Sequence, residues 1–283
     1  MFAKISYTWS LMRASWNVLK ADKTLLLFPL LSGLCCVLVL ISFAVPIFLA
    51  GAWHPPARGA GQVSNVVYYG ILFLFYIANY FVITFFNTAI VSCAILRMAG
   101  RTATVGDGFR EAVSRLPQIA GWALLSATVG LILRIIEDRS KRLGRIVAGL
   151  LGMAWTVMSF LVVPVIVGER KGPFAALKES SAMLRRTWGE QLIGGFSFGL
   201  VFFLLSLPAV VLIFAGIVVA AHLGNLWLLA VAVVVAVVYL IVLSLLQSAL
   251  QSIFQAAVYL FAYNQMAPPG FAPELLAGAM RPK

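Results

Sequence analysis

The chain has 283 residues, of which 62% are apolar and 11% are charged, and its formal net charge is +12. Soluble domains contain about 45–50% apolar and about 25% charged residues, so this composition excludes a water-soluble globular domain. In so apolar a chain, the excess of Lys and Arg indicates basic membrane loops and contacts with anionic lipid headgroups rather than with nucleic acid.

The first 23 residues predict an amphipathic helix that lies in the membrane interface. Apolar side chains recur every three or four residues and share one helical face, with two Trp suited to headgroup depth. The residues of this face are Phe2, Ile5, Trp9, Met12, Trp16 and Leu19. The opposite side carries Lys4, Thr8, Ser15 and Lys20. A cleavable signal peptide fits less well, because the apolar stretch over residues 25–50 is longer than such a peptide needs.

Six apolar segments are long enough to cross a bilayer, which takes about 20 helical residues. They run over residues 24–52, 66–96, 117–133, 145–168, 191–220 and 226–263. With the N-terminal helix they form one integral membrane domain over residues 1–265. Residues 266–283 are rich in proline and predict a flexible tail. The predicted fold class is therefore all-α, a polytopic helical membrane protein with about six membrane segments.

The distribution of Lys and Arg among the loops predicts the orientation. With six crossings and the N-terminus inside, 15 basic residues face the cytoplasm and 6 face the outside, so both termini are expected in the cytoplasm. The segment from Arg134 to Arg145 departs from this rule, since it holds five of the outer basic residues. If residues 117–168 dipped into the bilayer from inside without crossing, the totals would become 20 and 1. Both arrangements stay open at this point.

Two further amphipathic segments precede the third and the fifth crossing. One begins near Asp107, a residue that can cap a helix, and its apolar face holds Phe109, Val113 and Leu116. The other begins at Pro173, which is favourable in a first helical turn. Its apolar face holds Phe174, Leu177, Ser181, Leu184 and Trp188. With the N-terminal segment they predict three interfacial helices on the cytoplasmic side.

Polar side chains follow one face of the second crossing and one face of the sixth, where each polar group is costly unless it faces protein or water. The stripe on the second crossing consists of Tyr80, Thr84, Asn87 and Thr88. The stripe on the sixth crossing consists of Ser244, Gln247, Ser248, Gln251 and Gln255. Such stripes line either a hydrated solute path or an interface between helices or between subunits.

Charged residues lie mainly at the ends of the crossings, and the sequence carries no recognisable catalytic or metal-binding motif. A basic cluster follows the fourth crossing and consists of Arg170, Lys171, Lys178, Arg185 and Arg186. We expect this cluster to contact anionic lipid headgroups, with the gathering of a soluble anion as the alternative. The sequence therefore predicts no enzyme, no metal site, no cofactor and no nucleic-acid partner.

Residues 163–169 (Val-Pro-Val-Ile-Val-Gly-Glu) and 186–190 (Arg-Thr-Trp-Gly-Glu) resemble those of an uncharacterised prokaryotic family of integral membrane proteins with a domain of unknown function. Residues 15–33 are similar to the same family, so the resemblance covers most of the chain, and it implies no activity. More distantly, residues 15–33 resemble the CysZ-like sulfate permeases. The interfacial helix and partly penetrating hairpin of that family would suit the unusual distribution of charge.

From these features we expect an oligomeric protein of the bacterial inner membrane whose partners are membrane lipids and further copies of the chain. The leading hypothesis is a channel or transporter for a small solute or anion, with a path lined by the two polar stripes. The alternative is a non-transporting membrane protein that organises lipid or a partner complex through its interfacial helices and its basic surface.

Overall fold

The computed structural model describes residues 2–49, 62–139, 143–188, 198–264, 266–269 and 271, and the regular elements in these ranges are all helices. The first half of the chain forms α1 (Phe2–Ala21), η1 (Lys23–Leu26), α2 (Leu27–Leu49), α3 (Gln62–Met98) and α4 (Val105–Ser114). The second half forms α5 (Leu116–Arg139), α6 (Leu143–Met158), α7 (Val162–Glu169), α8 (Pro173–Trp188), α10 (Phe198–Leu223) and α11 (Leu226–Asn264).

Six helical segments of the described chain are long enough and apolar enough to cross a membrane. They run over Lys23–Leu49, Val66–Met98, Leu116–Asp138, Leu143–Glu169, Val201–Leu223 and Leu226–Asn264. The fourth segment contains both α6 and α7, which a turn at residues 159–161 separates. The protein is thus an all-α polytopic membrane protein, as the sequence predicted.

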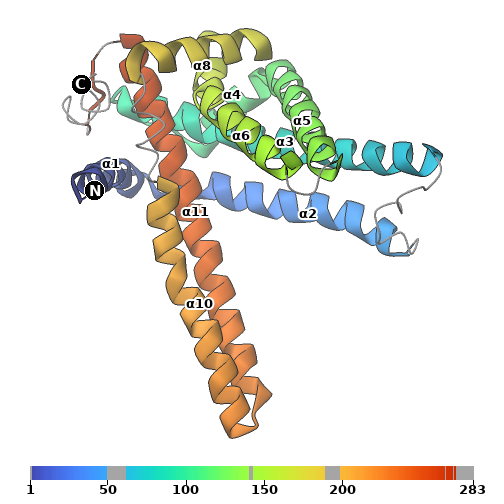
Figure 1. Ribbon diagram of the computed structural model, residues 1–283. Helices are drawn as coiled ribbons and strands as arrows, with labels where there is room; N and C mark the ends of the chain where they lie inside the picture. Colours follow the sequence, from blue (N-terminus) through green and yellow to red (C-terminus); the bar gives the residue numbers. More distant parts are fainter. Residues whose placement is uncertain are drawn as a thin grey trace.

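Two long hairpins extend in different directions from a common region of packing (Figure 1). One hairpin consists of α2 and α3, and the other consists of α10 and α11. A third hairpin, α5 with α6, lies against α3. α10 packs chiefly against α11, whereas α11 also contacts α1, α2, α3 and α7. The second half of α11 is therefore the element that joins the two long hairpins.

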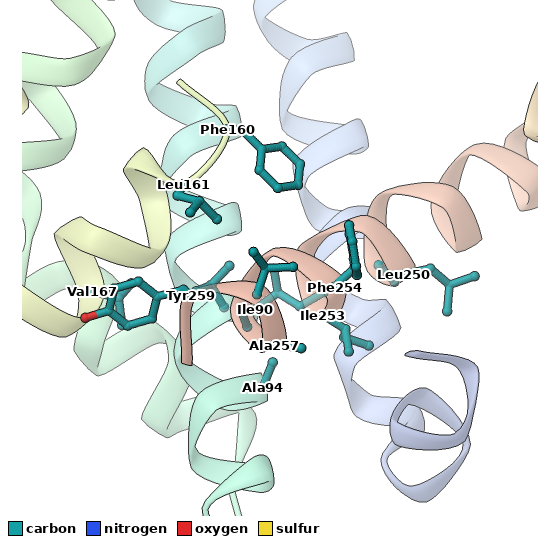
Figure 2. Close-up of a cluster of buried hydrophobic side chains, with 14 of the residues drawn as sticks. Ile90, Ala94, Phe160, Leu161, Val167, Leu250, Ile253, Phe254, Ala257 and Tyr259 are labelled. Carbon is teal, nitrogen blue, oxygen red and sulfur yellow. The ribbon is translucent and has the colours of Figure 1, made fainter. Parts of the chain in front are cut away.

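The core lies where α3, the α6–α7 junction and α11 meet (Figure 2). Ile90 and Ala94 of α3 lie beside Ile253 and Ala257 of α11, and all four side chains are at most 1% exposed. Burial of this kind contributes about 25 cal/mol for each Å² of apolar surface removed from water, and inside a bilayer the close packing itself holds the helices together. The contact between α3 and α11 is consequently a dry, tightly packed interface.

A capping box fixes the start of α4. The Thr104 hydroxyl accepts a hydrogen bond from the Asp107 backbone N–H (3.2 Å), and the Asp107 carboxylate accepts one from the Thr104 backbone N–H (3.0 Å). The sequence predicts a helix here with Asp107 as its cap, whereas the N-cap residue is Thr104 and Asp107 is the third residue of the helix. These reciprocal bonds satisfy two backbone donors that the first helical turn leaves free.

Gly108 brings α4 close to α2 and α3. A Cβ atom at this position would lie 2.6 Å from the Phe28 ring and 2.8 Å from the Cys93 sulfur. Phe28 in turn contacts the Phe109 ring, with ring centroids 5.7 Å apart. The absence of a side chain at residue 108 is therefore what lets α4 pack directly on the two neighbouring helices.

Arg97 ties the end of α3 to the end of α1. Its guanidinium donates a hydrogen bond to the Ala21 carbonyl oxygen (3.0 Å) and lies 3.7 Å from the Asp22 carboxylate. The same carboxylate accepts a hydrogen bond from the Thr24 backbone N–H (3.1 Å) and so caps η1. These contacts set the turn between the interfacial helix and the first crossing.

The predicted apolar face of α1 is divided between the bundle, which Met12 and Leu19 contact, and the outside, where Trp9 and Trp16 are exposed. Leu11, Met12, Ser15 and Leu19 are buried, whereas Trp9 is 58% exposed. The buried residues lie on the side of α1 that packs on the bundle, where α11 is its main partner. The partner helix therefore selects the buried face, which includes a serine that was assigned to the polar side. The side chains of Phe2 and Ile5 lie outside the described part of the chain.

The predicted apolar face of α8 is divided in the same way. Phe174 was expected on the apolar face and is 72% exposed, whereas Ser180 is fully buried with Ala176, Met183 and Leu184. The Ser180 hydroxyl donates a hydrogen bond to the Met158 carbonyl oxygen (2.7 Å) and accepts one from the Leu161 backbone N–H (3.0 Å). Ser180 thereby satisfies the backbone groups that the break between α6 and α7 exposes.

Candidate functional site

A cavity of about 570 Å³ opens between α3, α4, α7 and α11, close to the residues at which α3 and α11 end. Small-molecule sites in proteins typically have volumes of about 300–1,000 Å³. We call this space the α3–α11 cavity. Its lining combines charged and polar residues with apolar residues.

The charged lining residues come from α4 and the segment before it. The cavity is lined here by Arg101, Asp107, Arg110 and Glu111. Arg110 lies 3.6 Å from the Asp107 carboxylate, and Glu111 pairs with Arg115. Among the described residues, no carboxylate lies within ion-pair distance of Arg101, which is exposed. The Arg101 guanidinium is therefore a cation of the cavity wall that is available to bind an anionic ligand.

Hydrogen bonds from Thr104 hold the pKa of Asp107 below its usual range, and Arg110 and Arg101 act in the same direction. Asp107 thus carries a negative charge at neutral pH, and this charge remains matched by Arg110. The cavity wall does not present Asp107 as a free acid or base.

Arg115 does not line the cavity but bonds to two residues that do, Glu111 and Val167. Its side chain is 5% exposed, and one terminal nitrogen donates hydrogen bonds to the Glu111 carboxylate and to the Val167 carbonyl oxygen (3.1 Å from the latter). Burial lowers the pKa of Arg115, and the neighbouring Glu111 opposes that effect. The Arg115 Nε atom is buried without a hydrogen-bond partner among the described residues. Arg115 therefore links α4 to the end of α7.

The apolar lining residues come from α3, α7 and α11 and are Ile95, Leu96, Val167 and Leu260; α3 and α11 also contribute Ser92, Tyr263 and Asn264. Tyr259 lies next to Val167 (Figure 2), and its ring packs directly on Gly168. A Cβ atom at residue 168 would lie 2.7 Å from Cζ of this ring. Gly168 therefore allows Tyr259 to form part of the wall.

An ion-pair network lies beside this wall. Lys171 Nζ lies 2.8 Å from the Glu169 carboxylate and 2.8 Å from the Glu179 carboxylate. Hydrogen bonds to Glu169 and then to Glu179 raise the pKa of Lys171. Lys171 is therefore a link between α7 and α8 rather than a free cation for a ligand.

The other members of the predicted basic cluster do not line the α3–α11 cavity. Arg170, Lys178 and Arg185 are exposed. Arg170 adopts a left-handed backbone conformation (φ 55°) at the end of α7. The Arg186 side chain lies outside the described part of the chain. Contact of these residues with lipid headgroups stays a prediction.

The polar stripe on the second crossing takes part in helix packing. Thr84 and Thr88 are buried, and Asn87 is half-buried. The Tyr80 hydroxyl lies beside Gly130 of α5, where a Cβ atom would be 3.5 Å away. α3 and α5 are close neighbours along their lengths. At least the Tyr80 end of the stripe therefore contacts α5.

The polar stripe on the sixth crossing has a different environment. Ser244 is exposed and donates a hydrogen bond to the Ile241 carbonyl oxygen (2.8 Å) of its own helix. Gln247, Gln251 and Gln255 are half-buried, as is Ser248. Among the residues that the structure describes, none of the three amides makes a hydrogen bond.

The structure does not bring the two stripes together. α3 contacts α11 through Ile253 and Ala257 (Figure 2). Gln251 and Gln255 each lie two residues from Ile253, which is a rotation of about 200° on an α-helix. The amides of α11 therefore point away from α3, and a solute path lined by both stripes stays a prediction.

The residues of the α3–α11 cavity were not among the predicted site residues. One available signal was the spacing of Glu111 and Arg115, since residues four apart on a helix can pair. Arg101, Tyr259 and Gly168 carry no such local signal. They approach one another only because α4, α7 and α11 converge on α3.

A comparison with known protein families matches residues 66–269 to a family described as a family of unknown function, DUF6159. No curated protein and no solved structure matches the chain. The comparisons therefore do not support the resemblance to the CysZ-like sulfate permeases.

Proposed function

The chain belongs to the DUF6159 family of unknown function, and from this premise we propose that it is a membrane protein that binds an anionic amphiphile in the α3–α11 cavity. The observation that carries the proposal is the combination of an unpaired Arg101 and an apolar wall within one cavity. An arginine offers several donors to a phosphate or carboxylate. The apolar wall offers no recognition to a fully hydrated anion, but it suits an alkyl chain.

The position of the cavity agrees with an amphiphile. It lies at the ends of two membrane-crossing helices, where the apolar residues Ile95 and Leu260 give way to Arg101 and Asn264. With the membrane boundary at this level, lipid headgroups would meet hydrocarbon chains beside the cavity, and basic residues there would attract anionic lipids at about 1 kcal/mol each. The proposal corresponds to the lipid-interacting alternative rather than to transport. The dry contact between α3 and α11 favours binding over passage.

We further propose that the protein resides in the inner membrane of a bacterium with both termini in the cytoplasm. Arg97, Arg101 and Lys171 lie at the end of the bundle that carries the α3–α11 cavity. The positive-inside rule places such an end in the cytoplasm. The amphiphile would then enter from the inner leaflet.

The test compares two arginine variants by native mass spectrometry after purification from membranes that contain phosphatidylglycerol and phosphatidylcholine. We expect wild-type protein to retain phosphatidylglycerol, and Arg101→Gln to retain about fivefold less, the equivalent of about 1 kcal/mol. Arg145→Gln is the matched control, because Arg145 is 75% exposed at the start of α6, does not line the cavity and is not part of the basic cluster. Equal losses in both variants, or no preference for the anionic lipid, would refute the proposal.

A second arm distinguishes a lipid from a free anion. Inorganic phosphate at millimolar concentration is added to the lipid-loaded protein. Retention of phosphatidylglycerol despite the added phosphate supports an amphiphile held by both walls. Displacement by phosphate alone would show that the apolar wall contributes nothing and would contradict this assignment.

A further inference from the structure

We infer that a second cavity, between α3, α5 and α6, binds an uncharged sugar, either free or as the headgroup of a glycolipid. α5 contacts both α3 and α6, and the cavity between the three helices has a volume of about 450 Å³ (Figure 1). This volume is typical of small-molecule sites. We call this space the hairpin cavity. It shares no lining residue with the α3–α11 cavity, so the inference does not depend on what that cavity binds.

The charges at the hairpin cavity are balanced. Arg134 lies 3.6 Å from the Glu137 carboxylate and 3.4 Å from the Asp138 carboxylate, and Arg145 lies 3.8 Å from the Glu137 carboxylate. Both arginines belong to the segment that departs from the positive-inside rule, and here each of them has a carboxylate beside it. A ligand with a net charge would be attracted by one pair of groups and repelled by the other. The balance therefore favours a ligand without net charge.

The paired groups keep hydrogen-bonding capacity for a ligand. The two separations at Glu137, 3.6 and 3.8 Å, exceed the roughly 2.7–3.2 Å of an N–H···O hydrogen bond. The side chains of Arg134 and Glu137 are 40% and 38% exposed, so a ligand can reach both. A hydroxyl group donates and accepts at once. Neighbouring hydroxyls of a sugar can therefore donate to Glu137 and accept from Arg134.

Two tyrosines of α3 line the same cavity. The centroids of the Tyr76 and Tyr80 rings lie 6.3 Å apart, and both side chains pack beside Gly130 of α5. Within the described chain, neither tyrosine hydroxyl makes a hydrogen bond. A tyrosine combines an apolar ring face with a polar edge. This combination suits a sugar, whose ring presents C–H groups on its faces and hydroxyls at its rim.

The wall that α6 contributes leaves room for a ring. It contains Ala148 and Gly149, and a Cβ atom at residue 149 would meet no other atom within 4 Å. A leucine at residue 149 would therefore add bulk beside the hairpin cavity without displacing a neighbouring group.

Saturation-transfer NMR on the full chain in phosphatidylcholine nanodiscs tests the inference. The probes are the methyl glycosides of glucose, galactose, mannose and N-acetylglucosamine. We expect at least one to bind, and Glu137→Gln to weaken its binding by about tenfold, because the charge that strengthens the hydrogen bond is lost. Glu179→Gln is the matched control, since Glu179 is 30% exposed, pairs with Lys171 and does not line the hairpin cavity. Equal binding by both variants, or binding of none of the four probes, would overturn the inference.

A second variant keeps the inference testable if Glu137→Gln disturbs the hairpin. We expect Gly149→Leu to abolish binding of the glycoside and to leave the unfolding midpoint at least as high as that of the wild type, because leucine favours a helix more than glycine does. Gly33→Leu is the matched control, since a Cβ atom on this residue of α2 also meets no atom within 4 Å. Wild-type binding by Gly149→Leu would show that the sugar binds elsewhere and would contradict the assignment.

Competition tests whether the ligand is uncharged and where it comes from. Inorganic phosphate and ethanolamine, each at millimolar concentration, should leave the bound glycoside in place. Displacement by either ion would show that the cavity recognises a charge and would overturn the inference. Tighter binding of an alkyl glycoside than of the methyl glycoside identifies a glycolipid headgroup, and equal binding identifies a free sugar. Both of these outcomes support recognition of the sugar itself.

Discussion

Ser180 shows how a single buried hydroxyl can hold an irregular segment of a membrane helix. The fourth crossing is interrupted at residues 159–161, and backbone groups freed at such a break need partners. Ser180 of α8 accepts from Leu161 and donates to Met158. The break is therefore stabilised from outside the crossing, by a helix that follows it in the chain.

We expect Ser180→Ala to destabilise the protein by about 1–3 kcal/mol, because it leaves the Leu161 N–H buried without a partner. Ser181→Ala is the matched control, since the Ser181 hydroxyl bonds to carbonyl oxygens of its own helix. The measurement is the midpoint of unfolding in sodium dodecyl sulfate, followed by tryptophan fluorescence. If both variants unfold at the same midpoint, Ser180 does not hold the break.

At the scale of the element, α4 illustrates packing that depends on one missing side chain. Its capping box fixes where the helix begins, and Gly108 fixes how closely it approaches α2 and α3. Because α4 also carries Asp107, Arg110 and Glu111, its position determines the charged wall of the α3–α11 cavity.

Gly108→Ala should cost about 1–3 kcal/mol, because the new methyl group would overlap Phe28 and Cys93. Gly106→Ala should leave the stability unchanged or slightly raised, since the nearest atom to a Cβ there is Thr104 Oγ1 at 3.7 Å. Both variants are compared by the same detergent-unfolding midpoint. Equal effects at residues 106 and 108 would rule out close packing as the cause.

The interfacial helices also show what periodicity can and cannot predict. A period of 3.6 residues identified the segments that became α1, α4 and α8, because an amphipathic pattern depends on the residues of one element alone. It does not distinguish an apolar residue that packs on protein from one that faces outward: Met12 and Leu184 of the predicted apolar faces are buried, whereas Trp9 and Phe174 of the same faces are exposed. That choice depends on the neighbouring helix, which local sequence does not encode. The same reason explains why the cavity residues were missed.

At the scale of the whole molecule, the two long hairpins diverge (Figure 1), so they cannot both stand perpendicular to one bilayer. A tilted helix needs more residues to cross the same thickness. α3 has 37 residues and α11 has 39, well above the roughly 20 that an upright crossing requires. The extra residues of α3 and α11 therefore allow both helices to cross the membrane at a tilt, as their divergent arrangement requires.

The geometry of the α5–α6 hairpin leads us to expect two full crossings rather than a partial penetration. Its tip lies beside the start of α3, where the Tyr69 hydroxyl is 3.5 Å from the Asp138 carboxylate. Tyr69 lies about 44 Å along α3 from Met98, which spans more than the roughly 30 Å hydrocarbon core at any tilt up to about 40°. The charges of Arg134 and Arg145 would then lie at the far interface.

Cysteine labelling in sealed membranes tests this topology. We expect Leu143→Cys to react with an impermeant maleimide from the side opposite to Phe174→Cys, in a chain that lacks its native cysteines. Both positions are highly exposed, so accessibility within the protein does not limit the reaction. Reaction of both cysteines from the same side would establish the dipping hairpin instead.

The contact of α11 with α1 has a consequence for the synthesis of the chain. The first and last described helices pack against each other, and Ile253 and Ala257 complete a core that begins with Leu11 and Met12. A ribosome releases the second half of α11 only after all the other described helices. The earlier hairpins must therefore reside in the lipid as separate units until α11 arrives and closes the core.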